Sequence, residues 1–116
     1  MPRKFIKSFK YARAGAQHAM RTQRNLWIHF FIGLAVIGIA VWAKVSLLEL
    51  AVLVVTIFGV IVAEMINTSI EELVNILSPQ HRMEAGLAKN VAAAAVLLAA
   101  ASAIIVGCLI FIPRLI

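Results

Sequence analysis

Four polar side chains recur along one face of a helix predicted near the middle of the sequence. Glu64, Asn67, Glu71 and Asn75 follow one another at i, i+3, i+7 and i+11, a spacing that forms a single stripe. Carboxylate and amide oxygens accept protons or hold hard cations, so such a stripe could support acid–base or metal-assisted chemistry. The types of side chain and their spacing mark this face as a candidate site.

The position of Glu64 strengthens this interpretation. It follows the apolar run Ala51–Ala63 and precedes Met65 and Ile66, so its carboxylate falls inside the end of a membrane span. An acidic side chain costs about 2.5–3.5 kcal/mol at the centre of a span and less near the interface, and this cost usually accompanies a function. The alternative is a helix that extends into water with solvated side chains, and for Glu72 we adopt that simpler interpretation.

The elements that must position the stripe are membrane helices. The 116 residues are 63% hydrophobic and 14% charged, and a small water-soluble domain could not bury that much apolar surface. We therefore expect a single-domain, all-α membrane protein with an amphipathic N-terminal surface helix and three transmembrane helices. The expected ranges are 2–22 for the surface helix and about 26–43, 47–77 and 84–112 for the spans.

Basic residues set the expected orientation. Seven lysines and arginines precede the first span, whereas Lys44 alone lies in the first loop and Arg82 and Lys89 lie in or beside the second. Because such cations concentrate on the cytoplasmic side, we expect the N-terminus and the second loop in the cytoplasm. A basic block beside an apolar span indicates anionic lipid, and not nucleic acid, as its partner. Three thin helices should bury Glu64 poorly, so we also expect the chain to form oligomers.

The central motif resembles a known family. The run from Glu64 to Glu71 is followed by Lys89, fourteen residues after Asn75, and then by an alanine-rich helix. This arrangement resembles the prokaryotic diacylglycerol kinase and undecaprenol kinase family of small membrane lipid kinases over nearly the whole chain. Segments that resemble the undecaprenol kinase branch are Ser8–Ala12, Gly15, Arg24–Asn25, Ile28–His29 and Gly107–Pro113.

The resemblance implies an enzyme that uses magnesium and ATP to phosphorylate a lipid alcohol, with undecaprenol favoured over diacylglycerol. It also implies a homotrimer in the bacterial inner membrane, with sites between protomers at the cytoplasmic interface. Phosphoryl transfer needs mainly positioning and charge neutralisation, which a few acids and a cation can supply. By the resemblance, Glu64 matches the general base and Glu71 a magnesium ligand. The residues that match cofactor-binding positions are Gln23, Asn67, Asn75, Lys89 and Asn90.

The sequence departs from the family pattern at four positions. An amide stands where the family usually has an acid at Gln23, Asn75, Gln80 and Asn90. The chain contains no aspartate, and a magnesium site with fewer anions should be weaker. We favour an active kinase with compensating acids such as Glu72 or Glu84. The alternative is a catalytically weak or inactive relative that acts as a lipid- or partner-binding membrane scaffold. For His29, a role in the site and a simple interfacial position both stay open.

Overall fold

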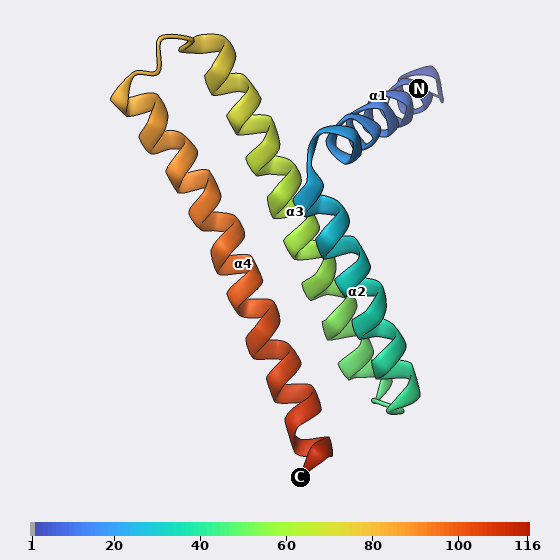
Figure 1. Ribbon diagram of the computed structural model, residues 1–116. Helices are drawn as coiled ribbons and strands as arrows, with labels where there is room; N and C mark the ends of the chain where they lie inside the picture. The colour runs from blue at the N-terminus through green and yellow to red at the C-terminus, as the bar shows by residue number, and fades with distance from the viewer. Residues whose placement is uncertain (1) are drawn as a thin grey trace.

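The computed structural model describes residues 2–116, which form four helices (Figure 1): α1 (Pro2–Thr22), α2 (Arg24–Trp42), α3 (Leu47–Leu77) and α4 (Met83–Leu115). No β-strand occurs within this range. The all-α fold predicted from composition and periodicity is confirmed. Helix α2 begins two residues and ends one residue before the predicted span, and α4 begins one residue before its predicted start.

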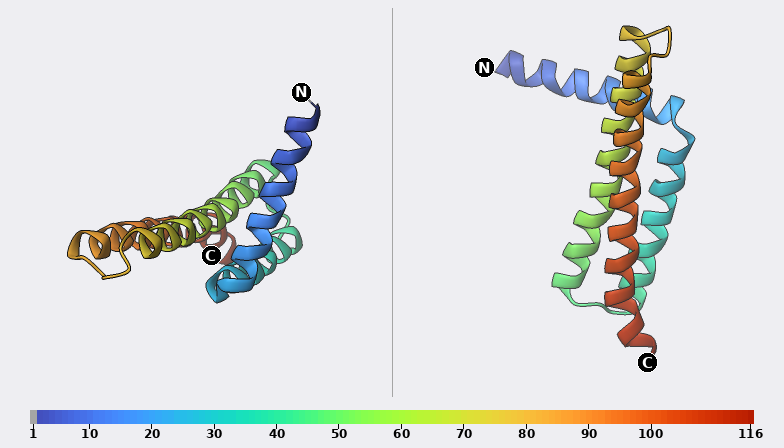
Figure 2. Two further views of the ribbon diagram at one scale, coloured as in Figure 1. Left: turned by 90° about the horizontal axis from the view of Figure 1, so that it is seen from above. Right: turned by 90° about the vertical axis from the view of Figure 1, so that its left-hand side faces the viewer.

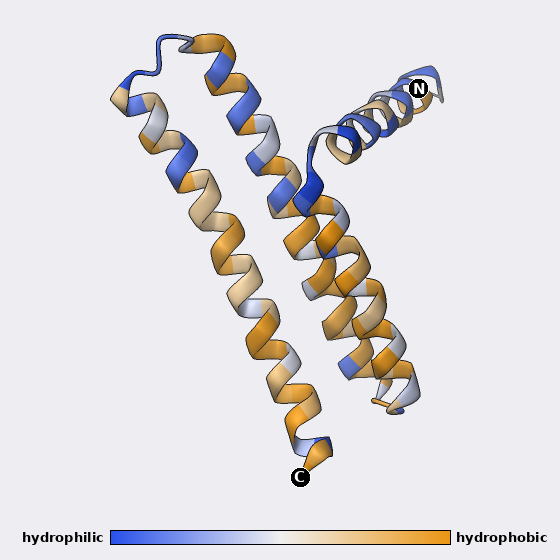
Figure 3. Ribbon diagram, in the orientation of Figure 1, coloured by the Kyte–Doolittle hydropathy of each residue, from blue (hydrophilic) through white to orange (hydrophobic). Residues whose placement is uncertain are grey.

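Helices α2, α3 and α4 are long and apolar enough to cross a membrane. Their surfaces carry large exposed hydrophobic side chains, such as Phe31, Phe58 and Leu98. Polar residues gather toward α1 and the loop between α3 and α4 (Figure 3). Exposed apolar surface of this extent is stable only against lipid or another apolar surface. The chain is therefore a multi-pass membrane protein, as its composition predicted.

Helix α3 is the centre of the bundle, because both α2 and α4 pack along it. Buried residues recur every seven positions along α2, at Leu26, Gly33 and Ala40, and this period is typical of helices that cross at a small angle. Leu53 of α3 and Ile110 of α4 meet Ala40 in a small core. This packing fixes the register of α2 against α3, and therefore which of their side chains face one another.

Local contacts define the helix ends opposite α1. Ser46 and Glu49 form a capping box at the start of α3, in which each side chain accepts a hydrogen bond from the other residue's backbone N–H. Glu49 also pairs with Arg114 of α4. Helix α4 was predicted to end at residue 112, but it continues through Pro113 to Leu115. A proline removes one backbone hydrogen-bond donor and bends a helix that continues beyond it. Pro113 lies in the last turn, where little helix follows, so α4 tolerates it there.

Helix α1 lies across the end of the bundle at which α2 begins (Figure 2). Its rings Phe5 and Phe9 are exposed and form an edge-to-face pair, with centroids 5.3 Å apart. Trp27 of α2 donates a hydrogen bond of 2.6 Å from Nε1 to the backbone oxygen of Met20. An exposed aromatic pair among cations suits a helix that lies on the membrane surface, and the tryptophan connects that helix to the first span.

Candidate active site

A cleft of about 440 Å³ lies among the start of α2 and the middle parts of α3 and α4. The polar side chains that line it come from α2, its preceding residue and α3: Gln23, Asn25, His29, Glu64, Asn67, Thr68 and Glu71. The α4 wall is apolar and consists of small or aliphatic side chains: Ala93, Val96, Leu97 and Ala100. The structure thus brings three of the four residues of the predicted stripe into one cleft.

Helix geometry gives the depth of this cleft in the membrane. Glu64 lies 17 residues after Leu47, the first residue of α3, which corresponds to about 26 Å along the axis. Glu71 lies seven residues farther, which adds about 10 Å. The hydrocarbon core of a bilayer is about 30 Å thick. A span that enters this core at Leu47 therefore carries Glu64 at the far edge of the core and Glu71 among the lipid headgroups.

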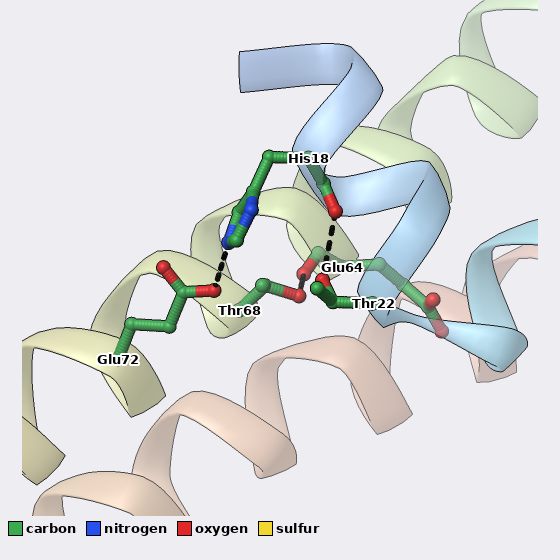
Figure 4. A network of polar contacts seen from close by, with 5 residues as sticks. All are labelled: His18, Thr22, Glu64, Thr68 and Glu72. Carbon is green, nitrogen blue, oxygen red and sulfur yellow. Dashed lines mark hydrogen bonds and ion pairs between the residues drawn. The ribbon is translucent and has the colours of Figure 1, made fainter. Parts of the chain in front are cut away.

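The Glu64 side chain is buried, with 7% of the residue exposed in a single protomer. The prediction that three helices would bury Glu64 poorly is therefore wrong, because α2 and α4 both cover this face of α3. His29 of α2 places Nδ1 2.6 Å from Oε1 of Glu64. The Thr68 hydroxyl donates a hydrogen bond of 3.0 Å to the Glu64 backbone oxygen (Figure 4). Burial of this acid consequently gives no reason to expect an oligomer.

Asn67 and Glu71 form the outer part of the cleft. Nδ2 of Asn67 donates a hydrogen bond of 3.1 Å to Oε1 of Glu71, while Oδ1 of Asn67 is buried without a partner. A buried acceptor without a partner costs free energy, which a donor or a cation in the cleft would recover. Among residues 2–116, no cluster of three or more His, Cys or Glu side chains could hold a metal by itself. A cation here would therefore need other oxygen ligands as well, such as amide oxygens of the cleft, water or a bound phosphate.

Lys89, which matches a cofactor-binding position of the family, lies next to this cleft and not in it. Lys89 of α4 donates a hydrogen bond from Nζ to Oδ1 of Asn75 on α3. Asn75 comes one helical turn after Glu71, so the two positions are separated by about 6 Å along the axis. Lys89 also borders a small hollow beside the loop between α3 and α4. The pair Asn75–Lys89 therefore lies on the water side of the polar cleft.

The remaining positions of interest are divided between the cleft and the surface. Gln23 lines the cleft, whereas Asn90 is exposed and lines neither hollow. Glu84 is also exposed at the start of α4. Glu72 is exposed to solvent, as predicted, and its Oε1 also lies 2.6 Å from Nε2 of the exposed His18 on α1 (Figure 4). Both acids that were expected to compensate for the missing charges thus lie outside the cleft.

Comparison with known proteins identifies the family. The sequence model of the prokaryotic diacylglycerol kinases matches residues 10–111. The chain belongs to this family. It is 44% identical over 109 residues to a diacylglycerol kinase of Synechocystis sp., in an alignment that covers 93% of this chain and 62% of that protein. It is 35% identical over 112 residues to the undecaprenol kinase of Bacillus subtilis, in an alignment that covers 97% and 91% of the two chains.

The resemblance drawn from the central motif is therefore confirmed at the level of the diacylglycerol kinase family. The chain spans 62% of the length of the Synechocystis relative and nearly all of the Bacillus one. Family membership sets the class of chemistry to consider.

Sequence reasoning missed two members of the cleft and left a third undecided. Asn25 was noted only as part of a segment that resembles the family, Thr68 was not singled out, and His29 had two open interpretations. A signal for Asn25 and His29 was present, because residues four apart share one face of a helix. The seven-residue period at Leu26 and Gly33 identifies the neighbouring face as the one that packs on α3. For Thr68, its position between Glu64 and Glu71 on α3 was the available signal.

Proposed function

We propose that this chain is an ATP- and magnesium-dependent kinase of a membrane lipid alcohol. Undecaprenol is the favoured acceptor and diacylglycerol the competing one. The observation that carries the proposal is a junction between the polar cleft and an apolar groove, at the depth where a lipid headgroup begins. At this junction, an acid that can accept a proton lies where a lipid would present its hydroxyl group.

The groove has a volume of about 370 Å³ and is lined by apolar side chains of α2, α3 and α4. His29 and Ala100 line both the groove and the polar cleft, so the two cavities adjoin. The groove continues along α4 past Gly107 to Phe111, toward the opposite end of the bundle. A lipid tail in this groove would present its hydroxyl group beside Glu64. One groove of this kind suits an alcohol with a single long tail, which favours undecaprenol.

In the proposed reaction, the lipid oxygen forms a bond to the γ-phosphorus of ATP, and the bond from this phosphorus to ADP breaks. Glu64 accepts the proton of the lipid hydroxyl group as the general base of this step. Lys89, beside Asn75, provides a cation for the phosphates on the water side. Each group thus contributes mainly by its position and charge.

The cleft fits a magnesium ion that arrives with the nucleotide. The Glu71 carboxylate and the unpartnered Oδ1 of Asn67 are hard oxygen donors of the kind this ion prefers. Magnesium usually binds through one or two carboxylates and completes its shell with phosphate oxygens and water, so the small number of acids does not exclude it. When bound, the ion neutralises charge on the transferred phosphoryl group. Gln23 lines the same cleft without a charge. We therefore expect magnesium to bind more weakly here than in a relative that has an acid at this position.

The basic residues before α2 support the proposal that the N-terminus and the cleft face the cytoplasm, in a bacterial inner membrane. ATP would reach Glu71 and Lys89 from that side. A homotrimer is supported by the resemblance of the central motif, and the exposed apolar surfaces of the spans allow either lipid or a neighbouring protomer to cover them. Oligomeric state is measured directly by the mass of the protein in detergent micelles.

The test of the proposal is phosphoryl transfer by the purified protein. The full chain is incubated in mixed micelles with magnesium, labelled ATP and either undecaprenol or diacylglycerol, and the label in the lipid fraction is measured. Glu64→Gln should abolish transfer to either alcohol while the protein keeps its helical content. Glu72→Gln is the matched control, since it changes the same side chain two turns away and outside the cleft, and it should retain activity.

The scaffold alternative predicts different results. A protein that only binds lipid transfers no phosphate to either alcohol and gains no thermal stability from magnesium-ATP. A functional nucleotide site raises the unfolding temperature by mass action as the nucleotide concentration exceeds the dissociation constant. No transfer under conditions in which a related kinase is active would refute the proposed function.

A further inference from the structure

His29 is the polar neighbour of the buried Glu64 carboxylate. Within residues 2–116, its Nδ1 is the one charged or hydrogen-bonding group that contacts this carboxylate, at 2.6 Å from Oε1. His29 comes from α2 and Glu64 from α3, so the contact depends on how these two helices pack. His29 also lines the apolar groove, which places it where the proposed lipid substrate would pass.

The chemistry of this contact requires a proton between the two atoms. Two lone pairs repel at 2.6 Å, so either the imidazole nitrogen or the carboxylate oxygen must carry a hydrogen. The ring N–H direction does not meet the carboxylate in line, and Nδ1 is otherwise buried without a partner. Catalytic hydrogen bonds are often poorly aligned in the free enzyme and become aligned when the substrate binds. The pair therefore consists of a hydrogen-bond donor and an acceptor that are already close together.

Other walls of the cleft leave the Glu64 carboxylate unsupported. The Thr68 hydroxyl is committed to the Glu64 backbone oxygen. The α4 wall offers the apolar side chains of Ala93, Val96, Leu97 and Ala100. In Figure 4 the Glu64 carboxylate points away from the pair formed by His18 and Glu72. A glutamate with three rotatable bonds needs a partner to stay in one position, and His29 is placed to be that partner.

We propose that His29 is a positioning residue, which holds one carboxylate oxygen of Glu64 so that the other oxygen faces the hydroxyl group of the lipid alcohol. This inference rests on the proposed function, because it needs Glu64 to be the base. The lipid proton passes to the free oxygen of Glu64, and the hydrogen bond from His29 keeps that oxygen oriented. His29 itself exchanges no atom with the substrate.

A pair of substitutions separates positioning from simple packing. His29→Asn keeps an amide N–H close to the place of Nδ1, whereas His29→Leu fills the space without a donor. We expect His29→Leu to lower kcat by about 10- to 100-fold with unchanged KM for both substrates, and His29→Asn to restore most of the loss. Equal losses in both variants, a wild-type kcat in His29→Leu, or a raised KM alone would overturn the inference.

His18 provides the matched control. It contacts Glu72 of α3 at the same distance of 2.6 Å but lies outside the cleft. His18→Leu therefore removes a histidine–glutamate contact between a helix and α3 without changing the surroundings of Glu64. We expect its kcat to equal that of the wild type. A loss as large as that of His29→Leu would mean that any such contact between helices matters, and it would contradict a specific role for His29.

A double substitution distinguishes failure of this inference from failure of the proposed function. Because Glu64→Gln is expected to be inactive, the double variant is built on Glu64→Asp, which keeps a carboxylate on a side chain one carbon shorter. If His29 acts through Glu64, then His29→Leu lowers kcat less in the Glu64→Asp background than in the wild type. An equal loss in both backgrounds would overturn the inference. Full turnover in Glu64→Gln alone would instead refute the assignment of Glu64 as the base. An inactive Glu64→Gln beside a fully active His29→Leu would refute only the role of His29.

A spectroscopic measurement tests the contact without any nucleotide. Histidine carrying a nitrogen isotope label is incorporated, and the ring nitrogens are observed by NMR in detergent micelles. Glu64→Gln should shift the Nδ1 resonance of His29 and leave those of His18 and His81 in place. A His29 resonance that does not respond to this change would show that the two side chains are not in contact, and the inference would fail.

Discussion

Replacing Gly33 by alanine should destabilise the bundle, although alanine is the better helix former. Gly33 is buried in the contact between α2 and α3, and a Cβ added there would lie 2.7 Å from Cγ2 of Ile57. Ile57 cannot easily move this methyl group, because a β-branched side chain in a helix has one strongly preferred χ1 rotamer. The two helices must therefore separate or repack to admit the new methyl group.

The size of the effect follows from two opposing terms. Overpacking of a close contact costs about 1–3 kcal/mol, whereas the change from glycine to alanine within a helix gains about 1 kcal/mol. The free energy of unfolding of Gly33→Ala should therefore fall by up to about 2 kcal/mol. Gly38 on the same helix is the matched control, since a Cβ there would meet nothing within 4 Å. Gly38→Ala should be neutral or gain up to about 1 kcal/mol.

Unfolding free energies are measured by titrating a denaturing detergent into mixed micelles while circular dichroism follows the helical content. Gly33 lies one turn from His29, so a separation of α2 from α3 should also lower kcat in Gly33→Ala and leave Gly38→Ala unaffected. Equal unfolding free energies for the two variants would refute the packing argument. A destabilised Gly33→Ala with undiminished kcat would instead show that the contact between His29 and Glu64 does not depend on this seam.

Three further substitutions test other parts of the structure. Ser46→Ala removes the capping box at the start of α3 and should lower the free energy of unfolding by about 1 kcal/mol in the same titration. Gln23→Glu adds an anion to the cleft and should lower the magnesium concentration needed for half-maximal activity. The control Gln17→Glu, exposed on α1, should not. Lys89→Met removes the cation beside Asn75 and should raise the KM for ATP, while the KM for the lipid stays constant; a change in the lipid KM alone would contradict its placement.

The features that the sequence predicted are those that depend on a single helix. The span lengths follow from apolar runs, and the shared cleft of Glu64, Asn67 and Glu71 follows from residues three and four apart on one face. Asn75 continues the same spacing, but it lies beyond the cleft, where it accepts a hydrogen bond from Lys89. The periodicity of α3 could not reveal this, because it does not say where the walls formed by α2 and α4 end.

Contacts between helices were beyond sequence reasoning. The meeting of His29 with Glu64 depends on the register of α2 against α3, and that register is set by the close approach at Gly33. The contact of Glu72 with His18 likewise depends on where α1 lies across the bundle. When each helix is considered alone, nothing distinguishes His29 from His18. Only their packing shows which histidine belongs to the cleft and which to the surface.

Under the proposed function, the depth of each acid lets one helix serve two substrates from different phases. For a span that enters the hydrocarbon core at Leu47, Glu64 lies at the far edge of this core, buried and near an apolar groove in which a lipid could approach. Glu71 lies about 10 Å farther along α3, among the headgroups, where a charged nucleotide can arrive with its cation. Exchanging these depths would leave the proposed base hydrated and the proposed metal ligand in lipid. The spacing of seven residues between them therefore matches the distance over which the membrane changes from hydrocarbon to water.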